Sequence, residues 1–119
     1  MKLRIKGDTI RLRLTQSEVS AVADGDAVVE TTSLPQPFTY ALEISGERIG
    51  AAFEAGRLTV SIPRVVALRW ASTEEVSLRG REGRVEILVE KDFACLVSRE
   101  GEEDPDAFPN PLAPSTEGT

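Results

Sequence analysis

The chain has 119 residues, of which 40% are hydrophobic and six are aromatic, so we expect one small domain with an aliphatic core. It has no histidine and one cysteine, which excludes a Ser-His-Asp or Cys-His nucleophile, an internal disulfide and an ordinary zinc site. The net charge of −6 lies in residues 100–119, because residues 1–99 hold 14 acidic and 14 basic side chains. Nothing in this composition predicts a cofactor.

The composition also predicts where the protein works. No apolar run approaches the roughly 20 residues that cross a bilayer. The first six residues alternate charged and aliphatic side chains, unlike a signal peptide. With a single cysteine, this predicts a cytoplasmic protein that has no membrane partner.

The first predicted elements are a β-hairpin and a short helix. Aliphatic residues alternate with polar ones on both sides of a Gly-Asp turn at residues 7–8, which is typical of a hairpin. Thr15 and Glu18 have the spacing of a capping box, so a helix should begin there. Val19 and Val22 should face the core, and residues 24–26 should end this helix.

Further strands follow, with one more helix. Residues 27–32 favour a strand, and Pro35 and Pro37 a loop. Pro63 predicts the start of the second helix. Its inward side should carry Val65, Val66 and Trp70, and a last hairpin should turn at residues 80–83. The alternating apolar faces of the strands comprise Phe38, Tyr40, Leu42 and Ile44; Ile49, Ala51 and Phe53; Leu58, Val60 and Ile62; Val76 and Leu78; and Val85, Ile87 and Val89.

These elements predict a mainly β fold, a small antiparallel β-barrel or sandwich with two short helices. Residues 1–99 should form the single domain, and residues 100–119 an acidic, proline-rich tail. The order of elements occurs twice, over residues 1–46 and 47–99, at an offset of 48 positions. This indicates a pseudo-twofold duplication, although alternating patterns also align by chance.

Two resemblances follow from these residues. The segment LTVSIPRVVALRWASTEEVSL, residues 58–78, resembles the strand, proline, helix and strand unit of AbrB-like swapped-hairpin regulators. In that family two chains interlock and present arginines to DNA, so the resemblance implies one chain that carries both units. The second unit lacks the usual glycine between helix and strand, and the body is neutral.

The other resemblance extends over the whole chain. KLRIKGDTIRLRLTQSEV, residues 2–19, LVEKDFACL, residues 88–96, and FPNP, residues 108–111, are similar to a family of small bacterial proteins of unknown function. The resemblance implies a bacterial protein with one domain, and it implies no mechanism.

The most basic part of the chain is the first hairpin, which carries the cations Lys2, Arg4, Lys6, Arg11 and Arg13. If the faces of its two strands coincide, these side chains form an anion-binding ribbon for phosphate or nucleic acid. The alternative is an ordinary solvent face that protects a sheet edge. No aromatic residue lies among the cations, so base stacking is not indicated.

Other candidate residues favour structural roles. Cys95 has no histidine to act as its base and is expected to be a small apolar residue. Trp70 is expected to anchor the core, and Phe108 to anchor the tail on the body. Acidic residues between 100 and 106 could bind a divalent cation, although a solvated run is commoner.

These observations favour a non-enzymatic binding or interaction module whose ligand is unknown. The alternative is a nucleic-acid-binding regulator that uses the basic hairpin, and an enzyme assembled from Asp, Glu, Arg or Lys stays open. The partner is unknown: a protein partner fits, and the neutral body disfavours nucleic acid. Since the tail is anionic, it should compete for the basic hairpin at low salt.

Overall fold

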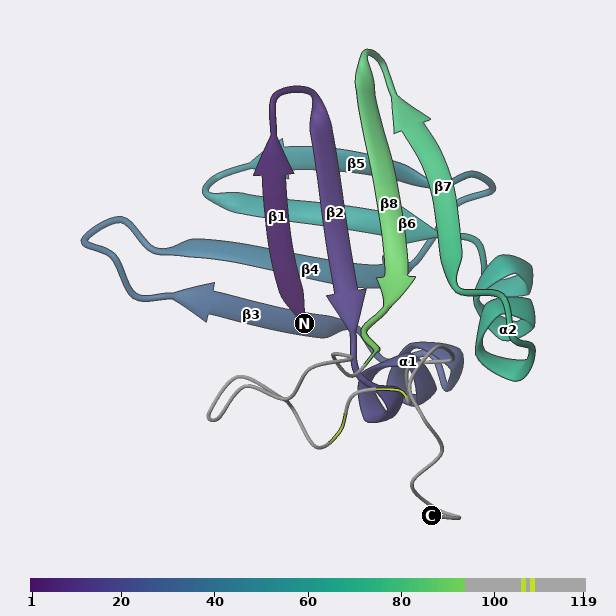
Figure 1. The fold of residues 1–119 in the computed structure, drawn as a ribbon. Coiled ribbons are helices and arrows are strands. Elements are labelled where there is room, and N and C mark those ends of the chain that lie inside the picture. Colours follow the sequence, from purple (N-terminus) through teal and green to yellow (C-terminus); the bar gives the residue numbers. More distant parts are fainter. Residues whose placement is uncertain (94–105, 107, 109–119) are drawn as a thin grey trace.

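The computed structural model describes residues 1–93, Asp106 and Phe108, which form two four-stranded sheets with two helices (Figure 1). Sheet A has the strand order β1-β2-β8-β7, and sheet B has the order β3-β4-β6-β5. The mainly β fold with two helices is confirmed. The elements are β1 (Lys2–Lys6), β2 (Thr9–Leu14), α1 (Gln16–Ala23), β3 (Val28–Thr32), β4 (Phe38–Ile44), β5 (Gly50–Glu54), β6 (Arg57–Ile62), α2 (Arg64–Ser72), β7 (Ser77–Glu82) and β8 (Val85–Lys91).

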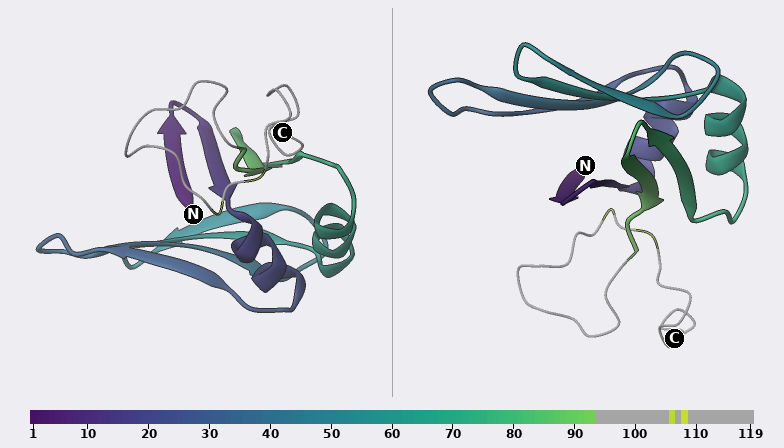
Figure 2. Two further views of the ribbon diagram at one scale, coloured as in Figure 1. Left: turned by 60° about the horizontal axis from the view of Figure 1, so that its bottom comes forward. Right: turned by 90° about the horizontal axis from the view of Figure 1, so that it is seen from above.

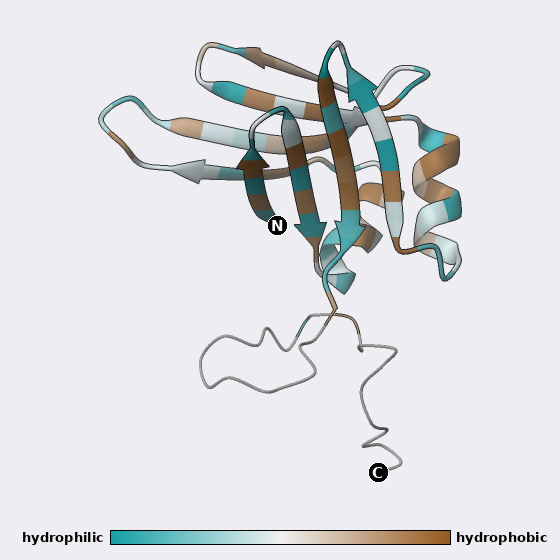
Figure 3. Cartoon of the chain, turned by 45° about the horizontal axis from the view of Figure 1, so that its top comes forward, coloured by the Kyte–Doolittle hydropathy of each residue, from teal (hydrophilic) through white to brown (hydrophobic). Residues whose placement is uncertain are grey.

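The two sheets lie in separate layers, and their strands cross (Figures 1 and 2). Both helices lie at one end of the sandwich (Figure 2). Aliphatic side chains at alternate strand positions fill the space between the layers. Figure 3 shows this alternation along β2. The molecule is therefore a sandwich rather than a closed barrel.

Each sheet combines a hairpin from the first half of the chain with one from the second half. The four hairpins are antiparallel, as predicted. The central pairs, β2 with β8 and β4 with β6, are parallel, which differs from the all-antiparallel expectation. The two halves thus share one order of elements and one pairing scheme, while their origin by duplication stays a prediction.

The two helices differ in how well their inward faces were predicted. Helix α1 begins at a capping box, where the Thr15 backbone N–H donates to Glu18 Oε1 at 2.9 Å. In α2, Trp70 is fully buried, and its indole N–H donates to the Val76 carbonyl at 3.0 Å. The prediction for Val65 is wrong, since it is 75% exposed. It lies two residues before buried Ala67, about 200° around the helix.

The last hairpin turns later than predicted. Glu82 pairs with Val85, so the turn is formed by Gly83 and Arg84, and Gly83 has a φ of +58°. Gly80 lies inside β7, where a Cβ would be only 2.5 Å from the Cβ of Ile49. The close approach of β7 to the segment before β5 therefore explains a glycine inside a strand.

Phe108 contacts the body at the end of β8. Its backbone N–H donates to the Asp92 carbonyl at 2.7 Å, and its ring centroid lies 5.7 Å from that of Phe93. The ammonium of Lys91 is 5.5 Å from the Phe108 ring centroid. Cys95, the acidic residues 100–104 and the remaining tail lie outside the described residues, so the predictions about them, and the domain boundary at residue 99, stay predictions.

Candidate functional site

The first hairpin brings the five predicted cations onto one face. Its register places Lys2 opposite Arg13, Arg4 opposite Arg11, and Lys6 opposite Thr9. Residues directly opposite in an antiparallel pair point to the same side of the sheet. All five cations therefore lie on the outer face of sheet A, away from sheet B.

This face extends over the whole sheet because β8 and β7 continue the same rows. Seven cations and two carboxylates give the outer face, called the basic face below, a charge of +5. Sequence reasoning missed Arg79 and Arg81, which reach the face only through the parallel pairing of β2 with β8. The three rows, read from β1 to β7, are Lys2, Arg13, Glu90 and Ser77; Arg4, Arg11, Leu88 and Arg79; and Lys6, Thr9, Glu86 and Arg81.

Carboxylates on β8 and just after it neutralise part of the basic face. Glu90 lies 3.4 Å from Arg11 Nε and 3.6 Å from Arg13 Nε. The ammonium of Lys2 is 2.9 Å from Asp92 Oδ2, and Arg79 is 3.4 Å from Glu86. Within residues 1–93, Asp106 and Phe108, the cations of this face without an ion pair are Arg4, Lys6 and Arg81.

Arg4 and Lys6, which have no ion pair among the described residues, border a hollow on the basic face. It measures about 180 Å³ and is lined by Arg4, Lys6, Thr9 and Arg11. The Nε of Arg11 is buried and has no hydrogen bond within the described part of the chain, although it lies within ion-pair distance of Glu90. Guanidinium groups, an ammonium and a hydroxyl are the donors that bind phosphate or carboxylate oxygens. The hollow can therefore accept one anionic group.

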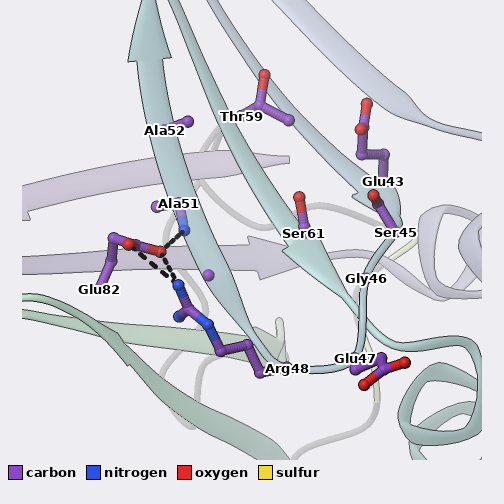
Figure 4. Close-up of a pocket in the computed structure, with 11 residues that line it drawn as sticks. Glu43, Ser45, Gly46, Glu47, Arg48, Ala51, Ala52, Thr59, Ser61 and Glu82 are labelled. Carbon is purple, nitrogen blue, oxygen red and sulfur yellow. Dashed lines mark hydrogen bonds and ion pairs between the residues drawn. The ribbon is translucent and has the colours of Figure 1, made fainter.

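A second pocket, of about 430 Å³, lies beside β5 and has a different character (Figure 4). Glu43 and Glu47 line it with Ser45 and Ser61, and Glu82 closes one side. Among the residues that the structure describes, no group of three or more acidic or cysteine side chains could hold a metal ion.

Glu82 is held in place by three hydrogen bonds, which Figure 4 shows. Arg48 Nη2 donates to both of its carboxylate oxygens at 3.1 Å, and the Ala51 backbone N–H donates to Oε1 at 3.2 Å. The hydrogen bond from Arg48, followed by that from Ala51, lowers the pKa of Glu82 below its ordinary value. These contacts join sheet A to the edge strand of sheet B.

A third pocket, of about 310 Å³, is apolar and lies between the two sheets. Ile5 on β1 and Phe53 on β5 are 55% and 64% exposed at its rim. A shift of 48 residues carries Ile5 onto Phe53 and Ile10 onto Leu58, so both halves contribute equivalent positions. The pocket, called the apolar pocket below, is lined by Ile5, Gly7, Ile10, Phe38, Phe53, Leu58 and Val85.

The remaining predicted residues do not join these pockets. Trp70 belongs to the core, and Phe108 packs at the end of β8. Asp106 accepts a hydrogen bond from the Ser17 hydroxyl, and its carbonyl accepts one from the Gln16 backbone N–H at 3.1 Å. The hydrogen bond from Ser17 is the main cause of a lowered pKa for Asp106. These contacts are structural rather than part of a ligand site.

Comparisons with known proteins give a family without an assigned activity. A family model described as a family of unknown function (DUF7009) matches residues 1–112. No curated protein and no solved structure matches the chain. Neither helix of the described residues is long and apolar enough to cross a membrane.

Proposed function

We propose that this chain, which belongs to the DUF7009 family of unknown function, is a non-enzymatic module that binds an anionic ligand on its basic face. The observation that carries the proposal is the hollow formed by Arg4, Lys6, Thr9 and Arg11. Two of its cations lack an ion pair among the described residues, and a third has an unsatisfied buried Nε. Within the described residues, the charges of Arg4 and Lys6 are therefore available to a ligand.

Neighbouring charges support the hollow as the centre of binding. Towards β8, Glu90 and Glu86 compete for the arginines, so an anion approaching there meets like charge. Towards the Gly7 turn, Lys6 and Arg4 face only Thr9 and Arg11 in the register. An anionic group of phosphate size is therefore best stabilised beside the turn.

Titration of the full-length chain with pyrophosphate, followed by calorimetry, tests this proposal. The variant Arg4→Ala with Lys6→Ala should weaken pyrophosphate binding about tenfold or more, since it removes the two cations of the hollow that have no ion pair among the described residues. The matched control is Arg57→Ala, which removes an exposed arginine from the outer face of sheet B. Equal affinity of the two variants, or no binding by the wild type at about 50 mM salt, would contradict the proposal.

A second candidate function is nucleic-acid binding, which the spread of cations to β7 favours. Arg79 and Arg81 extend the positive charge far beyond one hollow, as the contacts of a phosphate backbone require. The resemblance to AbrB-like regulators and the interlocked halves add support. The two glutamates and the lack of an aromatic residue on the face count against it.

Oligonucleotides distinguish the two candidates. A nucleic-acid binder should lose affinity steeply with rising salt and should weaken in Arg79→Ala with Arg81→Ala, whereas pyrophosphate binding should not change in that variant. Neutralising Glu100, Glu102, Glu103 and Asp104 should strengthen oligonucleotide binding at low salt, if the predicted competition by the tail occurs. Arg11→Glu with Arg13→Glu should abolish that gain. A bacterial origin and a cytoplasmic location stay predictions.

A further inference from the structure

The outer edge of β1 is a backbone surface with which no described strand pairs. β1 pairs with β2 on one side, and within residues 1–93, Asp106 and Phe108 no strand pairs with its other side. Figures 1 and 2 show this strand at the margin of sheet A. Its unpaired N–H and C=O groups can therefore hydrogen-bond to an added strand.

The two faces of β1 have opposite characters. Lys2, Arg4 and Lys6 point to the basic face, while Leu3 and Ile5 point between the sheets. Ile5 is exposed because it opens onto the apolar pocket, which Phe53 borders from the other sheet. Successive side chains of a strand added beside β1 would alternate between the two faces in the same way.

This geometry selects one kind of occupant. We propose that the edge of β1 binds an extended segment of a partner protein in which acidic and apolar residues alternate. The acidic side chains would lie beside Arg4 and Lys6, and the apolar ones would enter the pocket at Ile5 and Phe53. The proposal shares two cations with the anion site but does not depend on it.

Other occupants fit the same surface less well. A second copy that paired through β1 would place the cations Lys2, Arg4 and Lys6 opposite the same cations of the other chain. Like charges directly opposite each other are destabilising. A small amphiphile cannot fill both sites, because the hollow and the apolar pocket lie on opposite faces of the same hairpin. An extended strand reaches both faces at once.

A synthetic peptide in which Glu and Val alternate is a direct probe of the β1 edge. Fluorescence anisotropy with the full-length chain should show binding that weakens about tenfold or more in Phe53→Ser and in Arg4→Glu with Lys6→Glu. Val65→Ser, which changes an exposed valine on α2, is the matched control and should leave the affinity unchanged. Hydrogen exchange of β1 amides should slow when the peptide is bound.

Two further peptides separate strand addition from simple attraction. A peptide in which Glu and Ser alternate keeps the charge and should bind much more weakly, and N-methylation of alternate amides should abolish binding. Equal binding of the Glu-Ser or N-methylated peptide would overturn the proposal. A second outcome would also overturn it: the peptide does not bind, and sedimentation shows a dimer of the wild type that Phe53→Ser dissociates.

The outcome also separates this proposal from the anion site. Phe53→Ser should leave pyrophosphate binding unchanged, because Phe53 is not among the residues of the hollow. Peptide binding without pyrophosphate binding would contradict only the proposed function. Pyrophosphate binding by the wild type with no affinity for the Glu-Val peptide would contradict only the proposal for the β1 edge.

Discussion

Strands β1 and β5 form equivalent edges, one in each sheet, but the contacts along the two edges differ. A shift of 48 residues carries Lys2 onto Gly50 and Lys6 onto Glu54. At β5, the carboxylate of Glu82 accepts the Ala51 N–H, and Ile49 packs over Gly80. At β1, cations alternate with apolar residues, and no described strand pairs with its outer side. The edge of β5 is thus covered by contacts within the chain, whereas no described strand pairs with the outer edge of β1.

The largest effect is expected from a substitution at Gly80, which packs against the segment before β5. In Gly80→Ala the new Cβ would lie 2.5 Å from both Cβ and Cγ2 of Ile49, so β5 and β7 must move apart. We expect a loss of about 1–3 kcal/mol in the free energy of unfolding, measured by urea denaturation.

The neighbouring residue gives the control for Gly80→Ala. Arg79→Ala changes the adjacent position on the outer face and should cost at most about 0.5–1 kcal/mol. Combining Gly80→Ala with Ile49→Ala should cost less than the sum of the two single substitutions, because it removes Cγ2 from the contact although Cβ stays. Full stability of Gly80→Ala alone would show that the edge of β5 is not closed by this packing.

A smaller effect is expected where β1 begins. The Met1 ammonium pairs with Glu18 and, at 2.9 Å, with Glu30. Burial alone would lower the pKa of this ammonium, but the hydrogen bonds to Glu18 and Glu30 together raise it above its ordinary value of 8.0. The stabilisation is therefore complete below about pH 8 and is lost as the pH rises through the raised pKa.

Urea denaturation at neutral and at alkaline pH checks this prediction. Glu30→Gln should be less stable than the wild type at neutral pH, and the difference should shrink at alkaline pH. Glu43→Gln, a change on the outer face of sheet B, should show no such dependence. A constant difference across the pH range would mean that the ammonium does not hold the start of β1 to β3.

The smallest effect is expected for Glu82 under acidic conditions. Because its pKa is lowered in the folded chain, its contribution to stability is present above the ordinary value of 4.5 and is lost as the pH falls through the lowered pKa. Glu82→Gln should therefore reduce the acid dependence of the melting temperature. If Glu82→Gln left the acid dependence of the melting temperature unchanged, packing rather than this exposed carboxylate would hold the edge of β5.

Sequence patterns predicted the local structure well, because each strand and helix is encoded over a few residues. The alternation of Ile10, Leu12 and Leu14 predicted β2, and Thr15 with Glu18 predicted the start of α1. The inward side of helix α2 is predicted less well, since the prediction places Val65 and Val66 on the same side of the helix. A helix turns by about 100° per residue, so neighbouring valines face different surroundings.

The candidate site could be predicted only in part, because it depends on pairing across the chain. The five cations of the first hairpin were found, as their register follows from one short turn. Arg79 and Arg81 were missed, since they reach the basic face only through the parallel contact of β2 with β8. The apolar pocket likewise joins Ile5 to Phe53, which no local pattern connects.

The parallel contact of β2 with β8 also has a consequence for synthesis on the ribosome. Among the described strands β2 emerges second, but its central partner β8, which ends at Lys91, emerges last. Sheet A cannot be completed until nearly the whole body has been translated, and sheet B, whose last strand ends at Ile62, can be completed earlier. Until β8 is translated, the hairpin of β1 and β2 therefore has an unpaired strand edge on each side. Contacts of such long sequence separation slow folding, so this interval is when the nascent chain most needs protection from aggregation.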